Sequence, residues 1–196
     1  MLERTPTRGE QMLLFARNFL KHPRMLGSVI PSSRFLVDQV LRQVEWQRAR
    51  VIVEYGPGVG NFTTEILRRM RPDATLVVIE MNPSFVGFLR ETIVDSRLHV
   101  VEGSAADAAA LLAQLGKPSA DYVISGIPFT TLAPGVRESV LETTRGILRP
   151  DGAFLVYQFT ASVLPHLVRF FGHVERRFEP FNVLPAQVFY CQHRAA

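Results

Sequence analysis

An apolar run that ends in an acid and three alternate glycines, residues 51–60 (VIVEYGPGVG), constrains the fold of this chain more than any other stretch. Such a run, closed by glycines, is typical of a buried strand that enters a tight loop. Glycine lacks a Cβ atom, so the backbone can approach a ligand closely at Gly56, Gly58 and Gly60. The pattern therefore predicts a strand, a ligand-binding loop and a helix that begins near Asn61. The alternative is a tight turn that binds nothing.

The acid in this run indicates which ligand the loop approaches. The glycine spacing fits a dinucleotide site poorly, because Asn61 stands where that fingerprint needs its third glycine. Glu54 would repel a pyrophosphate, but its carboxylate suits the ammonium and sulfonium groups of S-adenosylmethionine. A second apolar run ends in Glu80, where the second strand of such a unit delivers an acid to both ribose hydroxyls. The two carboxylates together predict an S-adenosylmethionine site.

Composition bounds the class of protein. The chain has 196 residues, of which 47% are hydrophobic and 20% charged, and this predicts one globular domain. We find no apolar run of eighteen residues and no signal segment, so we expect neither a membrane-spanning helix nor export. One cysteine, Cys191, and five scattered histidines offer no set of metal ligands. We expect a cytoplasmic protein that needs no metal.

The net positive charge is concentrated in the first part of the chain. Residues 1–50 carry a net charge of +5, and the remainder is close to neutral. Residues 10–22 predict a helix with one apolar stripe and basic residues at its end. Such a helix either lies in a bilayer interface or packs its stripe on the domain core. We expect residues 8–25 to bind a phospholipid bilayer surface that contains anionic lipids.

Predicted strands and helices alternate along the chain. Helices are predicted at 33–47, 61–70, 83–94, 106–115, 135–148 and 162–171, and strands at 51–55, 75–80, 97–102, 120–125, 152–159, 173–181 and 186–193. This alternation predicts an α/β fold with a mostly parallel seven-stranded sheet covered by helices on both faces. Right-handed crossovers then place the ligand-binding loops at the carboxyl ends of the strands.

The E-x-G-x-G-x-G loop and the later strand-end acid resemble the class I, Rossmann-like S-adenosylmethionine-dependent methyltransferases. The resemblance implies an antiparallel hairpin at the C-terminus and a cofactor contact at Met81. It also implies an adenine contact after the third strand, at Gly103, Ser104 and Ala105, where many such enzymes have an aspartate. Ser104 or the backbone of Ala105 can make that hydrogen bond. Asp107 either supplies the acid or caps the next helix.

Two N-terminal motifs, residues 18–20 (NFL) and 27–33 (GSVIPSS), carry a closer resemblance. They look like the bacterial phospholipid N-methyltransferases, which convert phosphatidylethanolamine towards phosphatidylcholine and are similar to the rRNA adenine dimethyltransferases. In both families this segment is a lid over the cofactor, so the resemblance implies cofactor contacts at Ser28, Ile30 and Ser32. The alternative is a helix cap and a turn without ligand contact. We divide the single domain into a basic helix and lid at 1–48, packed on a methyltransferase domain at 49–196.

The loop after the fourth strand, residues 124–129 (ISGIPF), bears on the methyl acceptor. Adenine methyltransferases have N-(L/I/P)-P-(Y/F) here, and the asparagine holds the exocyclic amine of the flipped base. Gly126 stands in the place of that asparagine. A lipid amine needs only carbonyl acceptors and an apolar wall, so we expect Pro128 and Phe129 to line the acceptor site and Ser125 to contact both acceptor and cofactor. A plain turn after a strand is the alternative reading.

Tyr157, near the end of the fifth strand, is a further acceptor-site candidate. It could bind the lipid phosphate or take up the amine proton, or it could be an inward residue of a buried strand.

Three functions compete. A phospholipid N-methyltransferase would act as a monomer on phosphatidylethanolamine and its methylated intermediates, peripherally at the inner membrane, and would release S-adenosylhomocysteine. An rRNA adenine dimethyltransferase would act on RNA, but nucleic acid is the less favoured partner because Gly126 replaces the base-binding asparagine. A protein that binds S-adenosylmethionine or a membrane without catalysis is the third.

Overall fold

A computed structural model describes residues 32–193 of the chain. Within this range, seven strands form one sheet in the order β3-β2-β1-β4-β5-β7-β6. In chain order the strands are β1 (Val51–Tyr55), β2 (Thr75–Glu80), β3 (Leu98–Glu102), β4 (Ala120–Ser125), β5 (Leu148–Gln158), β6 (His173–Glu179) and β7 (Ala186–Gln192). The first five strands pair in parallel, and β7 is antiparallel to both β5 and β6. The predicted fold class and antiparallel C-terminal hairpin are confirmed.

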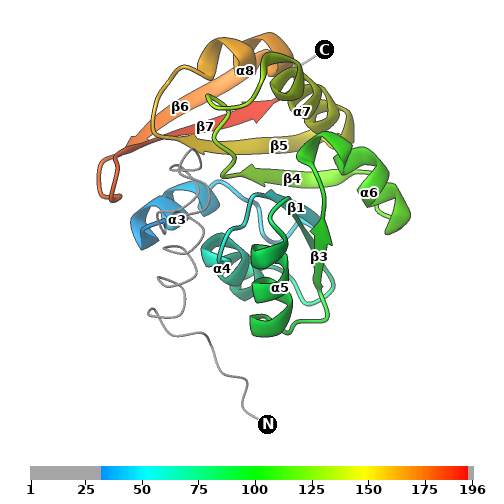
Figure 1. Cartoon of the computed structure of the whole chain (residues 1–196). Coiled ribbons are helices and arrows are strands. Elements are labelled where there is room, and N and C mark those ends of the chain that lie inside the picture. Colours follow the sequence, from blue (N-terminus) through cyan, green and yellow to red (C-terminus); the bar gives the residue numbers. More distant parts are fainter. Residues whose placement is uncertain (1–31, 194–196) are drawn as a thin grey trace.

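Helices cover both faces of the sheet (Figure 1). Over residues 32–193 they are α3 (Arg34–Leu41), α4 (Asn61–Arg69), α5 (Pro83–Thr92), α6 (Ala108–Gln114), α7 (Pro134–Ile147) and α8 (Leu164–Phe171), with a short 3-10 turn, η2 (Ala105–Asp107), before α6. Buried side chains of α3 and α4 share one core cluster with Ile52 of β1, while those of α6, α7 and α8 share a second cluster with Val53. Successive residues of a strand point to opposite faces, so the sheet separates two apolar layers.

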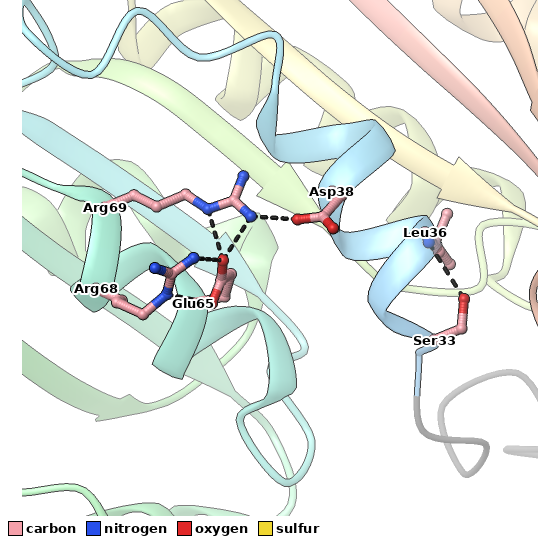
Figure 2. A network of polar contacts seen from close by, with 6 residues as sticks. All are labelled: Ser33, Leu36, Asp38, Glu65, Arg68 and Arg69. Carbon is pink, nitrogen blue, oxygen red and sulfur yellow. Dashed lines mark hydrogen bonds and ion pairs between the residues drawn. The ribbon is translucent and has the colours of Figure 1, made fainter.

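Helix α3 is fixed to α4 by polar contacts (Figure 2). Ser33 caps α3, since its Oγ accepts a hydrogen bond from the amide of Leu36 at 3.2 Å. On α4, Arg69 donates to Glu65 at 2.7 Å and also pairs with Asp38 of α3. These contacts cap the start of α3 and tie the helix to α4.

Two predicted boundaries differ from the structure by more than two residues. The helix expected at 33–47 ends at Leu41, because the next residues form i→i+3 turns and the amide of Glu45 instead donates to the Tyr122 hydroxyl at 3.1 Å. Strand β5 begins at Leu148 rather than at residue 152, and its register with β4 shifts between Ala120 and Tyr122.

Several predicted features lie outside the described residues. These are the helix at 10–22, the lipid contact of residues 8–25 and the cofactor contacts of Ser28 and Ile30. Among residues 32–193, no helix is both long enough and apolar enough to cross a bilayer.

Candidate active site

The loops predicted to bind ligands meet at the carboxyl edge of the parallel strands. The glycine loop follows β1 and the 126–129 loop follows β4, its direct neighbour in the sheet. The two loops are tied together at their start, because the amide of Gly126 donates to the carbonyl of Tyr55 at 3.1 Å. On the other side, the amide of Gly103 after β3 donates to the carbonyl of Glu80 at 3.0 Å. One continuous edge therefore carries the predicted cofactor and acceptor residues.

The glycine loop uses the conformational freedom of all three of its glycines. Gly56, Gly58 and Gly60 have φ angles of 67°, 58° and 84°, in the left-handed region that L side chains rarely adopt. At Gly60 a side chain would also lack space, since a Cβ atom there would stand 2.8 Å from Ile93 Cδ1 and 2.8 Å from Leu89 Cδ2. Helix α4 begins at the next residue. The alternation seen in the sequence thus follows from backbone geometry and packing.

Glu54 is a buried carboxyl beneath this loop. Its side chain is 3% exposed, and its Oε2 accepts a hydrogen bond from the hydroxyl of Thr63 at 2.7 Å. Burial is the main cause that raises the pKa of Glu54 to about 8. The hydrogen bond from Thr63 lowers this pKa in part, and the nearby charge of Glu80 raises it further. A carboxyl held in this state favours a cationic ligand, because a positive charge nearby would restore its ionised form.

Glu80 joins the end of β2 to the glycine loop. Its Oε1 accepts from the amide of Asn82 at 2.9 Å and its Oε2 accepts from the amide of Gly58 at 3.3 Å. The residue is 6% exposed, and burial raises its pKa despite these backbone hydrogen bonds. Met81, directly after it, is 70% exposed and offers an apolar surface at the rim.

These residues fit S-adenosylmethionine. The glycine loop presents backbone without side chains at three positive-φ positions, and the two buried carboxyls match the cationic and hydroxyl groups of that molecule. Glu54 and Gly58 would hold its methionyl part, and Glu80 its ribose. The bound molecule would supply an electrophilic methyl group.

The loop after β3 is shaped by Ser104. Its Oγ accepts from the amide of Ala106 at 3.2 Å and so caps η2. Ala105 is buried. A Cβ atom added to Gly103 would stand 3.0 Å from Leu111 Cδ1, so a side chain would be crowded there. Asp107 stands at the start of α6 but makes no side-chain capping bond, so the capping alternative for Asp107 is wrong. The Ser104 hydroxyl can still donate to an adenine nitrogen.

The 125–129 loop corrects part of the predicted acceptor site. Phe129 is fully buried and meets the ring of Phe154 edge-on at 6.2 Å, so it anchors the loop in the core and does not form an acceptor wall. Ser125 is also fully buried, and its Oγ accepts from the amide of Ile127 at 3.3 Å. Gly126, Ile127 and Pro128 are partly exposed. These three, rather than Ser125 and Phe129, form the accessible surface of the loop.

Gln158 holds this loop in place, a role that the sequence did not indicate. Its Nε2 donates to the carbonyl of Ile127 at 2.7 Å, and its Oε1 accepts from the amide of Phe129 at 3.1 Å. The side chain is 5% exposed. A buried amide that satisfies both a carbonyl and an N–H group of one loop fixes that loop to β5.

Tyr157 occupies the space beside Gly126. Its hydroxyl oxygen lies 2.2 Å from the point where a Cβ atom on Gly126 would stand. The ring stacks on Phe62 of α4 at 4.8 Å between centroids, and the hydroxyl hydrogen-bonds with Ser32. Desolvation raises the pKa of Tyr157, with a further rise from the charge of Glu54, so the phenol stays protonated at neutral pH. The structure thus brings Ser32, Glu54, Gly126 and Tyr157 together.

Metal ligands do not gather in the described part of the chain. Residues 32–193 contain no group of three His, Cys, Asp or Glu residues that could hold an ion. Cys191 is buried, and burial raises the pKa of its thiol.

A comparison with protein-family models matches residues 20–119 to the family described as Ribosomal RNA adenine dimethylase. The match covers just over half of the chain. The chain belongs to this family. It is therefore a class I S-adenosylmethionine-dependent methyltransferase, and the matched stretch contains Glu54, the glycine loop and Glu80. The match ends before β4, so it rests on the cofactor half of the dimethylase fold and not on the acceptor loop.

Two curated relatives differ in how much of this chain they match. Ornithine lipid N-methyltransferase of Singulisphaera acidiphila is 34% identical over 185 residues, which is 93% of this chain and 96% of the relative. Probable ribosomal RNA small subunit methyltransferase A of Methanococcoides burtonii is 25% identical over 99 residues, which is 50% of this chain and 33% of that protein. Nearly the whole of this dimethylase-family chain aligns with the lipid enzyme, whereas only half of it aligns with the RNA enzyme.

Solved structures share the fold. Precorrin-6y C5,15-methyltransferase of Geobacter metallireducens superposes with a TM-score of 0.65 at 17% identity, over 84% of this chain and 90% of that one. Human methyltransferase-like protein 13, solved in complex with S-adenosylhomocysteine, gives a TM-score of 0.61 at 19% identity, over 89% of this chain and 82% of that one. At these identities the likeness establishes the fold alone.

Proposed function

We propose that this methyltransferase transfers methyl groups from S-adenosylmethionine to the headgroup amine of a membrane lipid. The observation that carries the proposal is the pairing of Gly126 with Tyr157. An adenine methyltransferase needs an asparagine side chain at this position to grip the base, and here the Tyr157 hydroxyl fills that space. The full-length similarity to a protein named ornithine lipid N-methyltransferase supports a lipid acceptor.

Two lipid headgroups are candidates. Phosphatidylethanolamine is the acceptor that the N-terminal motifs favour, with methylation proceeding towards phosphatidylcholine. Ornithine lipid is the acceptor that the name of the 34% identical relative favours. Both present a primary amine at a bilayer surface, so one site chemistry serves either. We further propose that the enzyme is a cytoplasmic monomer held peripherally at the inner membrane, with residues 8–25 on its anionic lipids.

The residues of the site would assist the transfer by positioning. The amine must be neutral, so that its lone pair can form the new C–N bond while the C–S bond of the sulfonium breaks and an N–H proton leaves to water. The carbonyl groups of Gly126 and Pro128 would accept N–H hydrogen bonds and aim the lone pair. Tyr157 would donate or accept a hydrogen bond, but its raised pKa leaves no phenolate to act as a base at neutral pH. Placing the amine in line and excluding water supply most of the acceleration.

Methyl-labelled S-adenosylmethionine and three separate acceptors test this function. The acceptors are vesicles with phosphatidylethanolamine, vesicles with ornithine lipid, and ribosomal RNA. We expect label in one or both lipids and none in RNA, and a strong loss of label with the Glu80→Ala variant. Label in RNA alone would overturn the lipid function in favour of adenine methylation. Cofactor binding without label in any acceptor would favour a binding protein.

A further inference from the structure

Large apolar side chains stand exposed where the β6–β7 loop meets the start of α3. Phe181 and Val183 of the loop are 70% and 69% exposed, and Leu184 is 44% exposed. Phe35, in the first turn of α3, is 47% exposed, and its ring lies 5.7 Å from that of Phe181. These four side chains, called here the apolar rim, come from segments almost 150 residues apart.

Hydrogen bonds on the inner side of the loop hold the apolar rim in place. Asn182, only 9% exposed, accepts from the amide of Ser33 at 2.8 Å and donates to the carbonyl of Leu184 at 2.9 Å. The Ser33 hydroxyl donates to the carbonyl of Phe181 at 2.7 Å. The loop therefore turns its polar side chain inward and its apolar side chains outward. This is the reverse of the arrangement that water favours, and it indicates a surface that meets an apolar medium.

The apolar rim lies beside the active site. Strand β7 starts opposite the end of β5, with Gln187 paired to Gln158, so the β6–β7 loop projects from the same edge as the acceptor loop. In Figure 1 this loop and α3 lie on one side of the sheet. Ser33, which holds the loop, directly follows Ser32, whose hydroxyl bonds with Tyr157.

The charge around the apolar rim suits an anionic lipid surface. The six loop residues 180–185 carry no charge, and the acid that precedes them, Glu179, is 8% exposed and accepts from the amide of Phe181. Arg34 is exposed, with its guanidinium 5.0 Å from the centroid of the Phe35 ring. Aromatic and aliphatic side chains beside an exposed arginine are the composition of interfacial membrane anchors.

We propose that the apolar rim inserts into the interfacial region of a bilayer, between head groups and acyl chains, while Arg34 meets anionic head groups. This contact involves described residues alone and is separate from the one assigned to residues 8–25. The proposal rests on the proposed function in one respect: only with a lipid acceptor does the contact serve catalysis, by giving the lipid amine a short path from the bilayer surface to Gly126 and Tyr157.

Vesicle sedimentation with the full chain tests this contact. The vesicles contain phosphatidylethanolamine and phosphatidylglycerol, and the test variant is Phe181→Ser/Val183→Ser. The matched control is Phe178→Ser, which removes another exposed phenylalanine, 55% exposed, from β6. Val188 packs on the face of the sheet that α3 covers, and Arg177 is paired with it, so Arg177 points to that face. Successive residues of a strand point to opposite faces, so Phe178 points away from α3. We expect the double variant to bind at least about tenfold more weakly and the control to bind as the wild type does.

Further readouts separate the contact from folding and from catalysis. S-adenosylhomocysteine affinity should be equal in all three proteins, because none of the substituted residues is a predicted cofactor residue. In a Val183→Trp variant, lipids brominated in their acyl chains should quench the added fluorescence. Three results would each overturn the inserted rim: wild-type vesicle binding by the double variant, no quenching at position 183, or a wild type that is dimeric where the double variant is monomeric. Rim-dependent binding without methylation of any lipid would uphold it and count against the proposed function alone.

Discussion

The hydroxyl oxygen of Tyr157 lies 2.2 Å from the position that a Cβ atom on Gly126 would occupy. Real Cβ atoms do not come this close to other atoms, so any side chain at 126 requires the tyrosine to move. The ring has little freedom to do so, since it stacks on Phe62 and its hydroxyl bonds with Ser32. Residues 126 and 157 therefore determine together the shape of the acceptor site that we propose.

Gly126→Ala should slow methyl transfer by roughly 10- to 100-fold, because the displaced Tyr157 and the shifted loop no longer align the acceptor. Its effect on S-adenosylhomocysteine affinity should be much smaller. Gly135→Ala is the matched control, since nothing lies within 4 Å of a Cβ atom there. Steady-state kinetics and calorimetry measure both quantities. In the Gly126→Ala/Tyr157→Leu double variant the second change should partly relieve the first; strictly additive losses would mean that the two positions are independent.

Gly60→Ala should lower the free energy of unfolding by about 2–4 kcal/mol and weaken cofactor binding. The added methyl would meet both Leu89 and Ile93 at 2.8 Å, and a φ of 84° disfavours any L side chain. Gly87→Ala, in α5 with open space around it, should instead be neutral or stabilising by up to about 1 kcal/mol. Denaturant unfolding gives both values. An equal stability for the two variants would show that the crowding at Gly60 is absent in solution.

Cofactor binding should release a proton from Glu54. With a pKa of about 8 the carboxyl is mostly protonated at pH 7 without a ligand, and a cationic ligand favours its ionised form. The affinity for S-adenosylmethionine should therefore rise as pH increases towards about 8. The same proton makes the unliganded protein less stable as pH rises from about 4.5 to 8, because the unfolded state then loses a proton that the folded state keeps.

Calorimetry in two buffers of different ionisation heat measures this proton release. Glu54→Gln is the control, because its amide keeps the shape and the hydrogen bond to Thr63 but does not titrate. The released proton should disappear in this variant. Its persistence would assign the proton to another group, with Glu80 and Tyr157 the nearest titratable side chains.

Gln158→Leu should destabilise the fold by about 2–4 kcal/mol, since it leaves the buried amide of Phe129 and the carbonyl of Ile127 without their partner. Methyl transfer should fall further than the change in folded fraction explains, because the acceptor loop loses its tie to β5. Gln187→Leu on the paired strand is the control; that side chain accepts a surface hydrogen bond from Arg176, and we expect a change within about 0.5 kcal/mol. Similar melting temperatures for the two variants would contradict the loop-holding role of Gln158.

Local patterns were enough to predict the sheet and the cofactor edge. Short apolar runs bounded by glycine, proline or acids marked the strands. In the structure Glu80 is the last residue of β2 and Glu54 is the last but one of β1. Parallel strands bring such ends to one edge whatever the details of packing. The glycine loop was equally local, since its three left-handed residues lie within five positions of one another.

Roles that depend on distant partners were not predictable in the same way. Phe129 looked like an acceptor wall because a residue's own neighbours do not tell which side of a loop the core lies on. Gln158 holds a loop about thirty residues away, and Asn182 bonds with Ser33 almost 150 residues away. Such contacts exist only after the sheet has formed, so no spacing in the sequence records them.

The most direct measurement is a competition for the methyl group. Equal amounts of ribosomal RNA and of vesicles holding phosphatidylethanolamine and ornithine lipid are offered together to the wild-type chain with labelled S-adenosylmethionine, and each fraction is counted. If Gly126 and Tyr157 form a lipid-amine site, the label appears in lipid and its recovery in RNA stays at the level of the Glu80→Ala variant. Label that accumulates in RNA while the lipids stay unmethylated would contradict that site.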